Sequence, residues 1–250
     1  MLDPTGNREP SVEAFLLGPV NFDLMLALQQ RLVFDAGERA DGQITLLVCE
    51  HPPVVTVGRL GSRAHVRFAP RELASRQLSV RWVNRGGGAL LHGPGQLAVY
   101  PIVPLSYFRW TVGEYLARLQ QGLLDTLEDV GISGLTRPAS HGIWGRSGQL
   151  AAIGVAVKSW TTYFGAYLNV DPALAAFRYV SSDPQGGTPA SSLAAERRQR
   201  AQMPAVRAAI VPRLAGAFGI ERYHLYTGHP LLSQLTRSLS RSTAAISNER

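Results

Sequence analysis

The feature that most limits the fold of this chain is a glycine-rich segment between two apolar runs. Five of the twelve residues from Arg85 to Gln96 are glycine. The runs on either side, Leu78 to Val83 and Leu97 to Ile102, are typical of strands. Glycine at this density lets a backbone approach a ligand closely and adopt positive φ angles. The segment therefore predicts a loop between strands that forms the floor of a ligand site, with a plain surface loop as the alternative.

The pattern of these glycines excludes two common nucleotide sites. No Gly-Lys-Ser or Gly-Lys-Thr follows at the spacing of a phosphate-binding P-loop, and the dinucleotide-binding spacing is absent. Arg85 and His92 instead bring a cation and an imidazole to the segment. These two side chains favour a binding role over a plain loop.

The rest of the chain mixes helical and strand-like patterns. The predicted helices cover 22–35 after the cap Asn21, 111–130 with capping-box spacing and a stop at Gly131, and 191–215 with interruptions at Pro204 and Pro212. The predicted strands cover 44–49, 54–57, 78–83, 97–102, a hairpin over 143–157 that turns at 145–148, and 161–170. Without internal repeats or a linker, this mixture predicts one α+β domain.

The composition is that of an ordinary globular protein. Of 250 residues, 45% are hydrophobic and 17% are charged, which excludes a disordered chain. No apolar run approaches the roughly 20 residues that cross a bilayer, and the polar stretch Met1 to Pro10 does not resemble a signal peptide. We expect a cytoplasmic protein without membrane contact, with flexible termini over 1–11 and 231–250.

Charge and cysteine content narrow the choice of partners. The single cysteine, Cys49, excludes an internal disulfide and cysteine-rich metal centres, and we expect neither a metal nor a cofactor. The net charge of +7 favours an acidic partner. The basic residues are scattered along the sequence, which argues against nucleic acid.

Several motifs in order resemble the lipoate-protein octanoyltransferases. They are Glu50–Arg59 with its His-Pro-Pro turn, Arg85–Gly87, His92–Leu97, Tyr100-Pro101, Arg137-Pro138, His141–Trp144, Leu150–Val155 and Tyr167–Asp171. The resemblance spans residues 12–225, which we predict to form one octanoyltransferase-like domain. It implies a catalytic domain like that of the biotin and lipoate protein ligases, with a central mixed, mainly antiparallel sheet flanked by helices.

The resemblance also implies a reaction and its partners. Members of the family transfer an octanoyl group from acyl carrier protein to a lysine of a lipoyl domain, through a cysteine thioester assisted by a lysine. Both partner proteins are typically acidic, in agreement with the positive charge of this chain. The substrate-binding residues implied here are Arg85, Gly86, Gly87, Gly88, Ala89, Leu90, Leu91, His92, Ala152, Ile153, Gly154, Gly165, Ala166 and Tyr167.

The sequence departs from the family at both reacting positions. Gln149 stands where the family has its lysine, and Gln185 stands where it has its cysteine. An amide has no basic lone pair that could attack a thioester or accept a proton. Cys49 lies in an apolar strand and is predicted to be an inert core residue, while Lys158 is predicted to be a solvated strand end.

Three interpretations follow from these departures. The first is an octanoyltransferase-like protein of lipoate metabolism whose transfer activity is lost or strongly altered, as in a pseudoenzyme. The second is a non-catalytic protein that binds an acyl chain, acyl carrier protein or a lipoyl domain. The third is direct transfer without cysteine, with His92 as the base and backbone N–H groups near Arg85–Gly88 or Ile153-Gly154 stabilising the oxyanion. A replacement nucleophile at Ser181, Ser182 or Thr188 lacks an activating motif.

Overall fold

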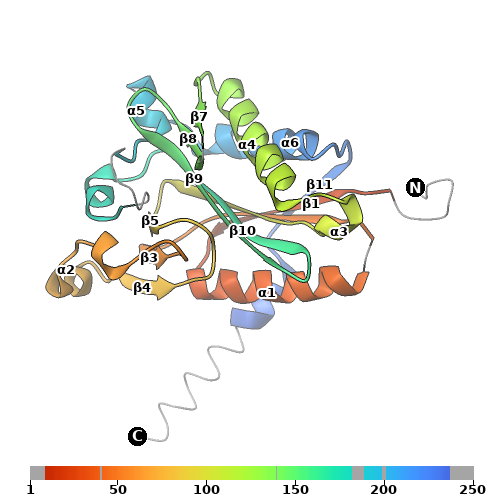
Figure 1. Cartoon of the computed structure of the whole chain (residues 1–250), viewed down its shortest axis with the longest axis horizontal. Coiled ribbons are helices and arrows are strands. Elements are labelled where there is room, and N and C mark those ends of the chain that lie inside the picture. Colours follow the sequence, from red (N-terminus) through yellow and green to blue (C-terminus); the bar gives the residue numbers. More distant parts are fainter. Residues whose placement is uncertain (1–8, 40, 139, 182–188, 199–200, 237–250) are drawn as a thin grey trace, which may run out of the picture.

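Two β-sheets form the centre of the molecule. The computed structural model describes residues 9–39, 41–138, 140–181, 189–198 and 201–236. The main sheet has eight strands in the order β11-β1-β2-β6-β10-β9-β8-β7 (Figure 1). β1 runs parallel to β11 and β2, and the other neighbours are antiparallel. The bounds are β1 Val12–Pro19, β2 Ile44–Glu50, β6 Gln96–Ile102, β7 Leu135–Arg137, β8 Ser140–Trp144, β9 Gln149–Lys158, β10 Thr161–Asn169 and β11 Tyr223–Thr227. The predicted α+β class and mixed, mainly antiparallel sheet are confirmed.

A second sheet corrects the prediction for the glycine-rich segment. It contains β4 (Ser79–Trp82), β3 (Val54–Val57) and β5 (Ala89–His92) in that order. β3 pairs with β4 in parallel and with β5 in antiparallel orientation. The prediction of one continuous loop from Arg85 to Gln96 is wrong, because its four central residues are buried and complete a β-ladder with β3.

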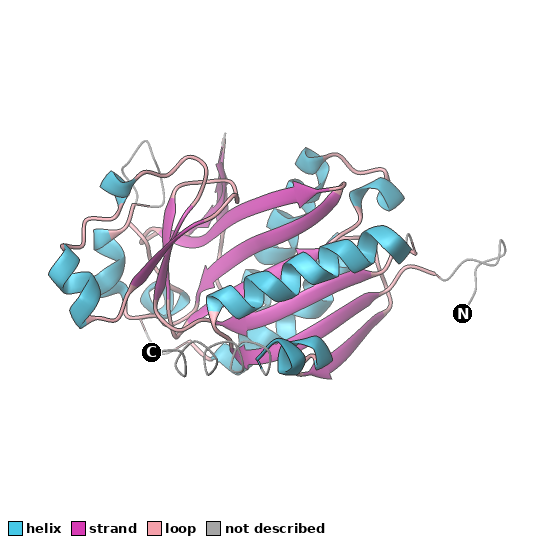
Figure 2. Ribbon diagram, turned by 90° about the horizontal axis from the view of Figure 1, so that it is seen from below, coloured by secondary structure: helices cyan, strands magenta, loops and turns pink. Residues whose placement is uncertain are grey.

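Helices cover both faces of the main sheet (Figures 1 and 2). On one face lies α1 (Phe22–Arg39). Its apolar side chains form a core together with side chains of β2, β6 and β10. On the other face lie α4 (Val112–Asp129) and α6 (Met203–Ala217), which enclose the larger core. The shorter helical elements are η1 Arg63–His65, α2 Pro70–Ser75, α3 Leu105–Phe108, η2 Leu174–Tyr179 and α5 Leu193–Arg197. None of the helices in the described ranges is long and apolar enough to cross a membrane.

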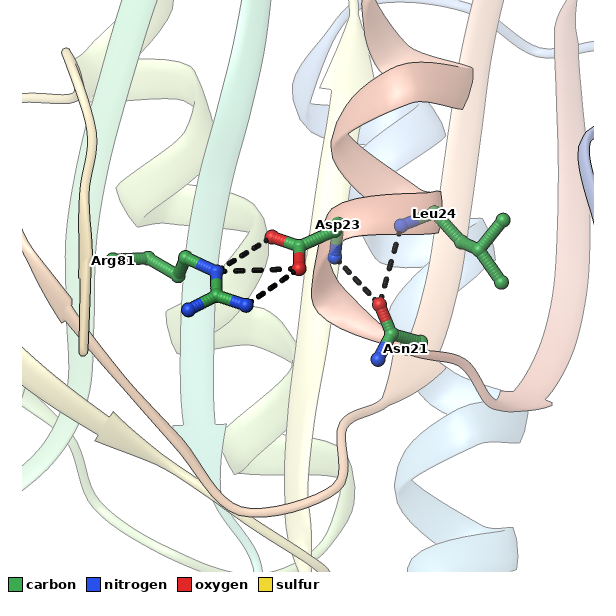
Figure 3. Close-up of polar contacts among 4 residues, drawn as sticks. All are labelled: Asn21, Asp23, Leu24 and Arg81. Carbon is green, nitrogen blue, oxygen red and sulfur yellow. Dashed lines mark hydrogen bonds and ion pairs between the residues drawn. The ribbon is translucent and has the colours of Figure 1, made fainter. Parts of the chain in front are cut away.

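The start of α1 follows the sequence signal and also contacts the second sheet. Asn21 Oδ1 accepts the N–H groups of Asp23 and Leu24 at 2.9 and 3.4 Å, which is the predicted N-cap (Figure 3). The Asp23 carboxylate pairs with Arg81 of β4, with Nη2 and Oδ2 2.9 Å apart. The first turn of α1 and the edge of the small sheet are therefore tied together.

The helices of the second half match their sequence signals in part. At the start of α4, Thr111 Oγ1 accepts the N–H of Glu114 at 3.2 Å and the Glu114 carboxylate accepts the N–H of Thr111 at 2.7 Å, which is the predicted capping box. Gly131, with φ 70°, follows the end of the helix as predicted. Pro204 lies in the first turn of α6, after a break from α5. The predicted interruption at Pro212 is wrong: α6 continues through it, because packing against α4 supports the helix despite one missing backbone bond.

The ends of the domain are only partly described. Residues 1–8 and 237–250 lie outside the described ranges. Residues 230–236 are helical, and Leu231, Leu232 and Leu235 pack against the core beneath α1. The domain limits of 12 and 225, and the flexibility of 1–11 and 231–250, stay predictions.

Candidate functional site

A cavity of about 340 Å³ lies between β5, the start of β9, the end of β10 and η2. This volume falls within the range of small-molecule sites. Six residues predicted as site residues line it: Ala89, Leu90, Leu91, Gln149, Ala152 and Tyr167. The other lining residues are Arg67, Gln96, Asn169, Leu174, Phe177, Arg178, Val180, Ser181, Pro189 and Ala190. The lining is mixed: apolar side chains of β5, β9 and η2 alternate with amide and hydroxyl groups and with two exposed guanidinium groups.

The predicted glycines shape the wall but are not among the lining residues. The N–H of Gly86 donates to the carbonyl of Val155 at 2.9 Å, which places the glycine-rich turn directly on β9. A Cβ atom at Gly154 would lie 2.6 Å from the carbonyl oxygen of Gly86. Gly87 adopts φ 81°, in the left-handed region. Together with Gly88, these residues allow two backbones to meet beside the cavity.

Three further predicted residues are directed away from the cavity. Ile153 and Ala166 pack in the larger core, on the face covered by α4 and α6. Their strand neighbours Ala152 and Tyr167 face the cavity, as the alternation of side chains along a strand requires. At Gly165 the β10 backbone packs so closely on β6 that an added Cβ would overlap a carbonyl oxygen. These three positions set the packing of the sheet and do not contact the cavity.

Below the cavity floor, His92 is the centre of a buried polar network. Gln96 donates its amide N–H groups to Leu91 O and Asn169 Oδ1, so its Oε1 accepts from His92 Nδ1 at 2.8 Å. His92 Nε2 then accepts from the hydroxyl of Thr56, also at 2.8 Å. Burial holds the pKa of His92 well below its usual value, so the imidazole is neutral. To act as a base, His92 would first have to lose its hydrogen bond from Thr56.

Arg85 continues this network as a buried cation. Its Nη2 donates to Thr56 Oγ1 at 2.8 Å and to Thr56 O at 3.1 Å, and its Nη1 donates to Gly86 O at 2.9 Å. The guanidinium carbon lies 6.0 Å from the centroid of the Tyr167 ring. Within the described ranges no carboxylate pairs with it. Burial lowers the pKa of Arg85, and carbonyl dipoles compensate its charge. Arg85 therefore fixes the glycine-rich turn from beneath.

A second neutral histidine lies beside the first. His51 Nδ1 donates to Val20 O and His51 Nε2 accepts from the Tyr100 hydroxyl, both at 2.6 Å. Burial lowers the pKa of His51 to about 4. The His51 and His92 ring centroids are 6.0 Å apart. Cys49 is fully buried nearby, and burial raises the pKa of its thiol far above neutrality, which supports an inert core cysteine.

Gln149 is the predicted reacting position that the structure places at the cavity. It is the first residue of β9, is half-buried, and is held by backbone hydrogen bonds to the segment 189–191. Its side chain lies over Gly142, where an added Cβ would be 2.6 Å from Nε2. Lys158 is exposed at the opposite end of β9, as predicted for a solvated strand end. An amide, and no amine, therefore faces the cavity from the start of β9.

The second reacting position is not part of the described structure. Gln185, with Ser182 and Thr188, lies outside the described residues. Ser181, the remaining candidate hydroxyl, lines the cavity. Among the described side chains, no group of three or more His, Cys, Asp or Glu residues could hold a metal ion.

Comparison with known proteins decides the family. The model of the lipoyl protein ligase A/B catalytic domain matches residues 21–214. The chain belongs to this family. An octanoyltransferase of Geotalea uraniireducens is 34% identical over 202 residues, which cover 80% of this chain and 90% of that protein. An octanoyltransferase of Chloroflexus aurantiacus is 36% identical over 212 residues, covering 82% and 93%. The solved structure of lipoate-protein ligase A bound with ATP matches with a TM-score of 0.70 and 14% identity, over 91% of this chain and 93% of that one. The lipoate-protein ligase-like fold implied by the motifs is confirmed.

The family motifs have a structural role that sequence reasoning missed. The His-Pro-Pro turn supplies His51, the Arg-Gly-Gly run supplies Arg85, and the His-Gly-Pro-Gly-Gln run supplies His92 and Gln96. In this member of the lipoyl protein ligase A/B family, all four side chains are buried, and Gln96 also lines the cavity. The sequence signal for this role was that each of these polar residues stands next to apolar residues typical of strands. Polar residues in such positions are usually buried and hydrogen-bonded.

Proposed function

We propose that this protein binds an octanoyl-type acyl chain in the cavity, and that transfer through a cysteine thioester is lost or strongly reduced in it. In the family reaction, the chain would pass from acyl carrier protein to a lysine of a lipoyl domain. One observation carries the proposal: Gln149 lines a cavity that also has an apolar wall, at the position where the motifs imply the assisting lysine. The apolar wall supports acyl binding, whereas Gln149 supplies no proton-accepting side chain at that position.

The cavity wall supports acyl binding independently of any chemistry. Leu90 and Leu91 of β5 and Ala152 of β9 provide apolar surface, and so do Leu174 and Phe177 of η2. An octanoyl chain has six methylenes and a methyl group, and each buried CH₂ contributes about 0.8 kcal/mol. Complete burial of the chain would thus contribute roughly 5 kcal/mol.

The chemistry of the reacting positions supports a loss of transfer. The amide of Gln149 can donate a hydrogen bond to a thioester carbonyl oxygen, but it does not take up a proton at neutral pH. Gln185 cannot form a thioester intermediate, because its amide is not nucleophilic. The acceptor lysine would have to lose its own proton, which costs roughly 4.6 kcal/mol at pH 7 for an amine of pKa about 10.4. His92 is engaged by Thr56 and is not positioned to relieve this cost.

Direct transfer is the second candidate, and one finding favours it. The relatives at 34% and 36% identity carry the name octanoyltransferase. In this reaction the neutral acceptor amine attacks the bound thioester carbonyl, the C–S bond breaks, and the leaving carrier thiolate takes up the proton that the amine nitrogen loses. No covalent enzyme intermediate forms. Orientation alone can lower such a barrier by about 7 kcal/mol, which is enough for slow transfer.

Intact-mass spectrometry separates the two candidates. A lipoyl domain is incubated with octanoyl acyl carrier protein and either the unmodified protein or the Gln149→Lys/Gln185→Cys variant. We expect acylation only with the double variant. Acylation by the unmodified protein at a comparable rate would overturn the proposed loss of transfer.

A binding measurement tests the other half of the proposal. Ala152→Phe places a ring in the cavity and is expected to weaken binding of octanoyl acyl carrier protein at least tenfold. Ala175→Phe makes the same change at an exposed site on η2 and serves as the control. Equal affinities of the two variants would contradict acyl binding in this cavity.

A further inference from the structure

Four exposed arginines form a connected set beside the cavity, two of them lining it. They are Arg63, Arg67, Arg76 and Arg178, which we call the arginine rim. Arg67 and Arg178 line the cavity itself, and the Arg67 guanidinium donates to the carbonyl oxygen of Arg178. The rim lies at the end of the molecule that carries α2 (Figure 1, left).

Contacts through two stacked rings show that the rim is contiguous. The rings of Phe68 and Tyr179 stack with their centroids 4.9 Å apart. Arg76 lies over Phe68 at 5.8 Å, Arg178 lies over Tyr179 at 5.1 Å, and Arg63 reaches the carbonyl oxygen of Phe68. Residues distant in the sequence thus form one basic surface.

The positive charge of this surface is not balanced locally. Residues 58–80 contain five arginines and one acidic residue, Glu72. The Glu72 carboxylate is turned back to accept the N–H of Ala69 at 2.8 Å. None of the rim arginines forms an ion pair with a carboxylate in the described ranges. An unpaired set of guanidinium groups beside a ligand cavity favours an anionic partner.

We propose that the arginine rim docks the acyl carrier protein, with Arg67 and Arg178 binding the phosphodiester of its phosphopantetheine arm. This inference rests on the proposed acyl binding. When the acyl chain occupies the cavity, the arm passes the two arginines that line it. A planar guanidinium binds phosphate oxygens in a bidentate manner and attracts an acidic protein surface as well. A lipoyl domain presents its lysine without a phosphate group, so the rim serves the acyl donor.

Affinity measurements with the carrier test the docking surface. Octanoyl acyl carrier protein is titrated into the unmodified protein and into Arg67→Gln/Arg178→Gln. The variant Arg31→Gln/Arg39→Gln on α1 removes the same two charges and is the control for net charge. We expect at least tenfold weaker binding by the double variant and less than twofold change in the control. The carrier without its phosphopantetheine arm also lacks the octanoyl group, so it should bind both proteins weakly. The double substitution should weaken binding of this armless form by a smaller factor than binding of the octanoyl form, because the phosphodiester is absent.

The possible outcomes decide between donor and acceptor docking. Unchanged carrier affinity in the double variant, or weaker binding only of a lipoyl domain, would overturn the inference. If the double variant does not fold, Arg76→Gln is used, since among the described residues its guanidinium lies on the ring face of Phe68 and makes no ion pair. A loss of about threefold supports the rim, and no loss refutes it. A failure of the proposed function is seen separately, as acylation by the unmodified protein or as unaltered binding by Ala152→Phe.

Discussion

Thr56→Val removes one hydroxyl from the buried polar network and keeps the side-chain shape. Thr56 is fully buried, donates to His92 Nε2, and accepts from Arg85 Nη2, both at 2.8 Å. In the variant His92 Nε2 loses this partner, whereas Arg85 Nη2 keeps its bond to the backbone carbonyl of residue 56 at 3.1 Å. A buried polar atom left unpaired costs about 1–3 kcal/mol, and the weakened bond to a cation adds about 1 kcal/mol. We therefore expect the free energy of unfolding to fall by about 2–4 kcal/mol.

Urea unfolding followed by circular dichroism measures this change. The slope of the unfolding free energy against urea concentration should be equal in the two proteins. In thermal unfolding, Tm of the variant should be lower by about 4–16 °C, given about 2–4 °C per kcal/mol for a domain of this size. Thr56→Ser is the matched control, because it keeps the hydroxyl and loses a methyl group, at a cost of about 1 kcal/mol. A valine variant within about 0.5 kcal/mol of the unmodified protein, or a serine variant less stable than valine, would refute the reasoning.

Three further perturbations test the packing around the site. The pKa of His51 is about 4 in the folded protein and near 6.5 in the unfolded chain, so the free energy of unfolding should rise with pH between these values. Urea titrations should show a loss of roughly 3 kcal/mol at the acid end of this range. The loss should be smaller in His51→Gln. Arg81→Ala breaks an exposed pair with Asp23, and we expect a loss below about 1 kcal/mol that disappears at 1 M salt; a larger loss would mean that this pair holds the small sheet in place. Gly165→Ala should cost about 3 kcal/mol or more in chemical unfolding, because the added Cβ would overlap a β6 carbonyl oxygen, whereas Gly93→Ala, with open space around it, should change little.

Local signals made the long helices predictable, whereas contacts between distant segments were not. Asn21 and Thr111 form the caps that their sequence neighbours indicated. β1 and β11 were not predicted. Every residue of β11 is exposed, so this strand has no buried face that a sequence pattern could indicate. The paired residues, Val12–Leu16 and Tyr223–Thr227, are separated in the sequence by most of the chain. Such a parallel pairing depends on the packing of everything between them.

The site was predictable to the level of its segments and not of its individual side chains. Leu90, Leu91 and Ala152 line the cavity as expected, yet Ile153, one residue away, faces the opposite core. This difference depends on the register of β9, which the sequence alone leaves open. The buried role of His92 was hidden for a similar reason, because its partner Thr56 lies 36 residues away.

The wall that would hold an acyl chain and the position implied for chemistry depend on different parts of the fold. Leu90 and Leu91 are fixed by the pairing of β5 with β3 and by the polar network around His92 below them. Gln149 instead begins β9, and its backbone hydrogen bonds do not depend on the identity of its side chain. A change of the Gln149 side chain leaves the pairing that fixes Leu90 and Leu91 intact, so binding and chemistry can be altered separately. For the same reason, Gln149→Lys keeps the backbone hydrogen bonds that begin β9, and acylation by the double variant would report on the scaffold itself.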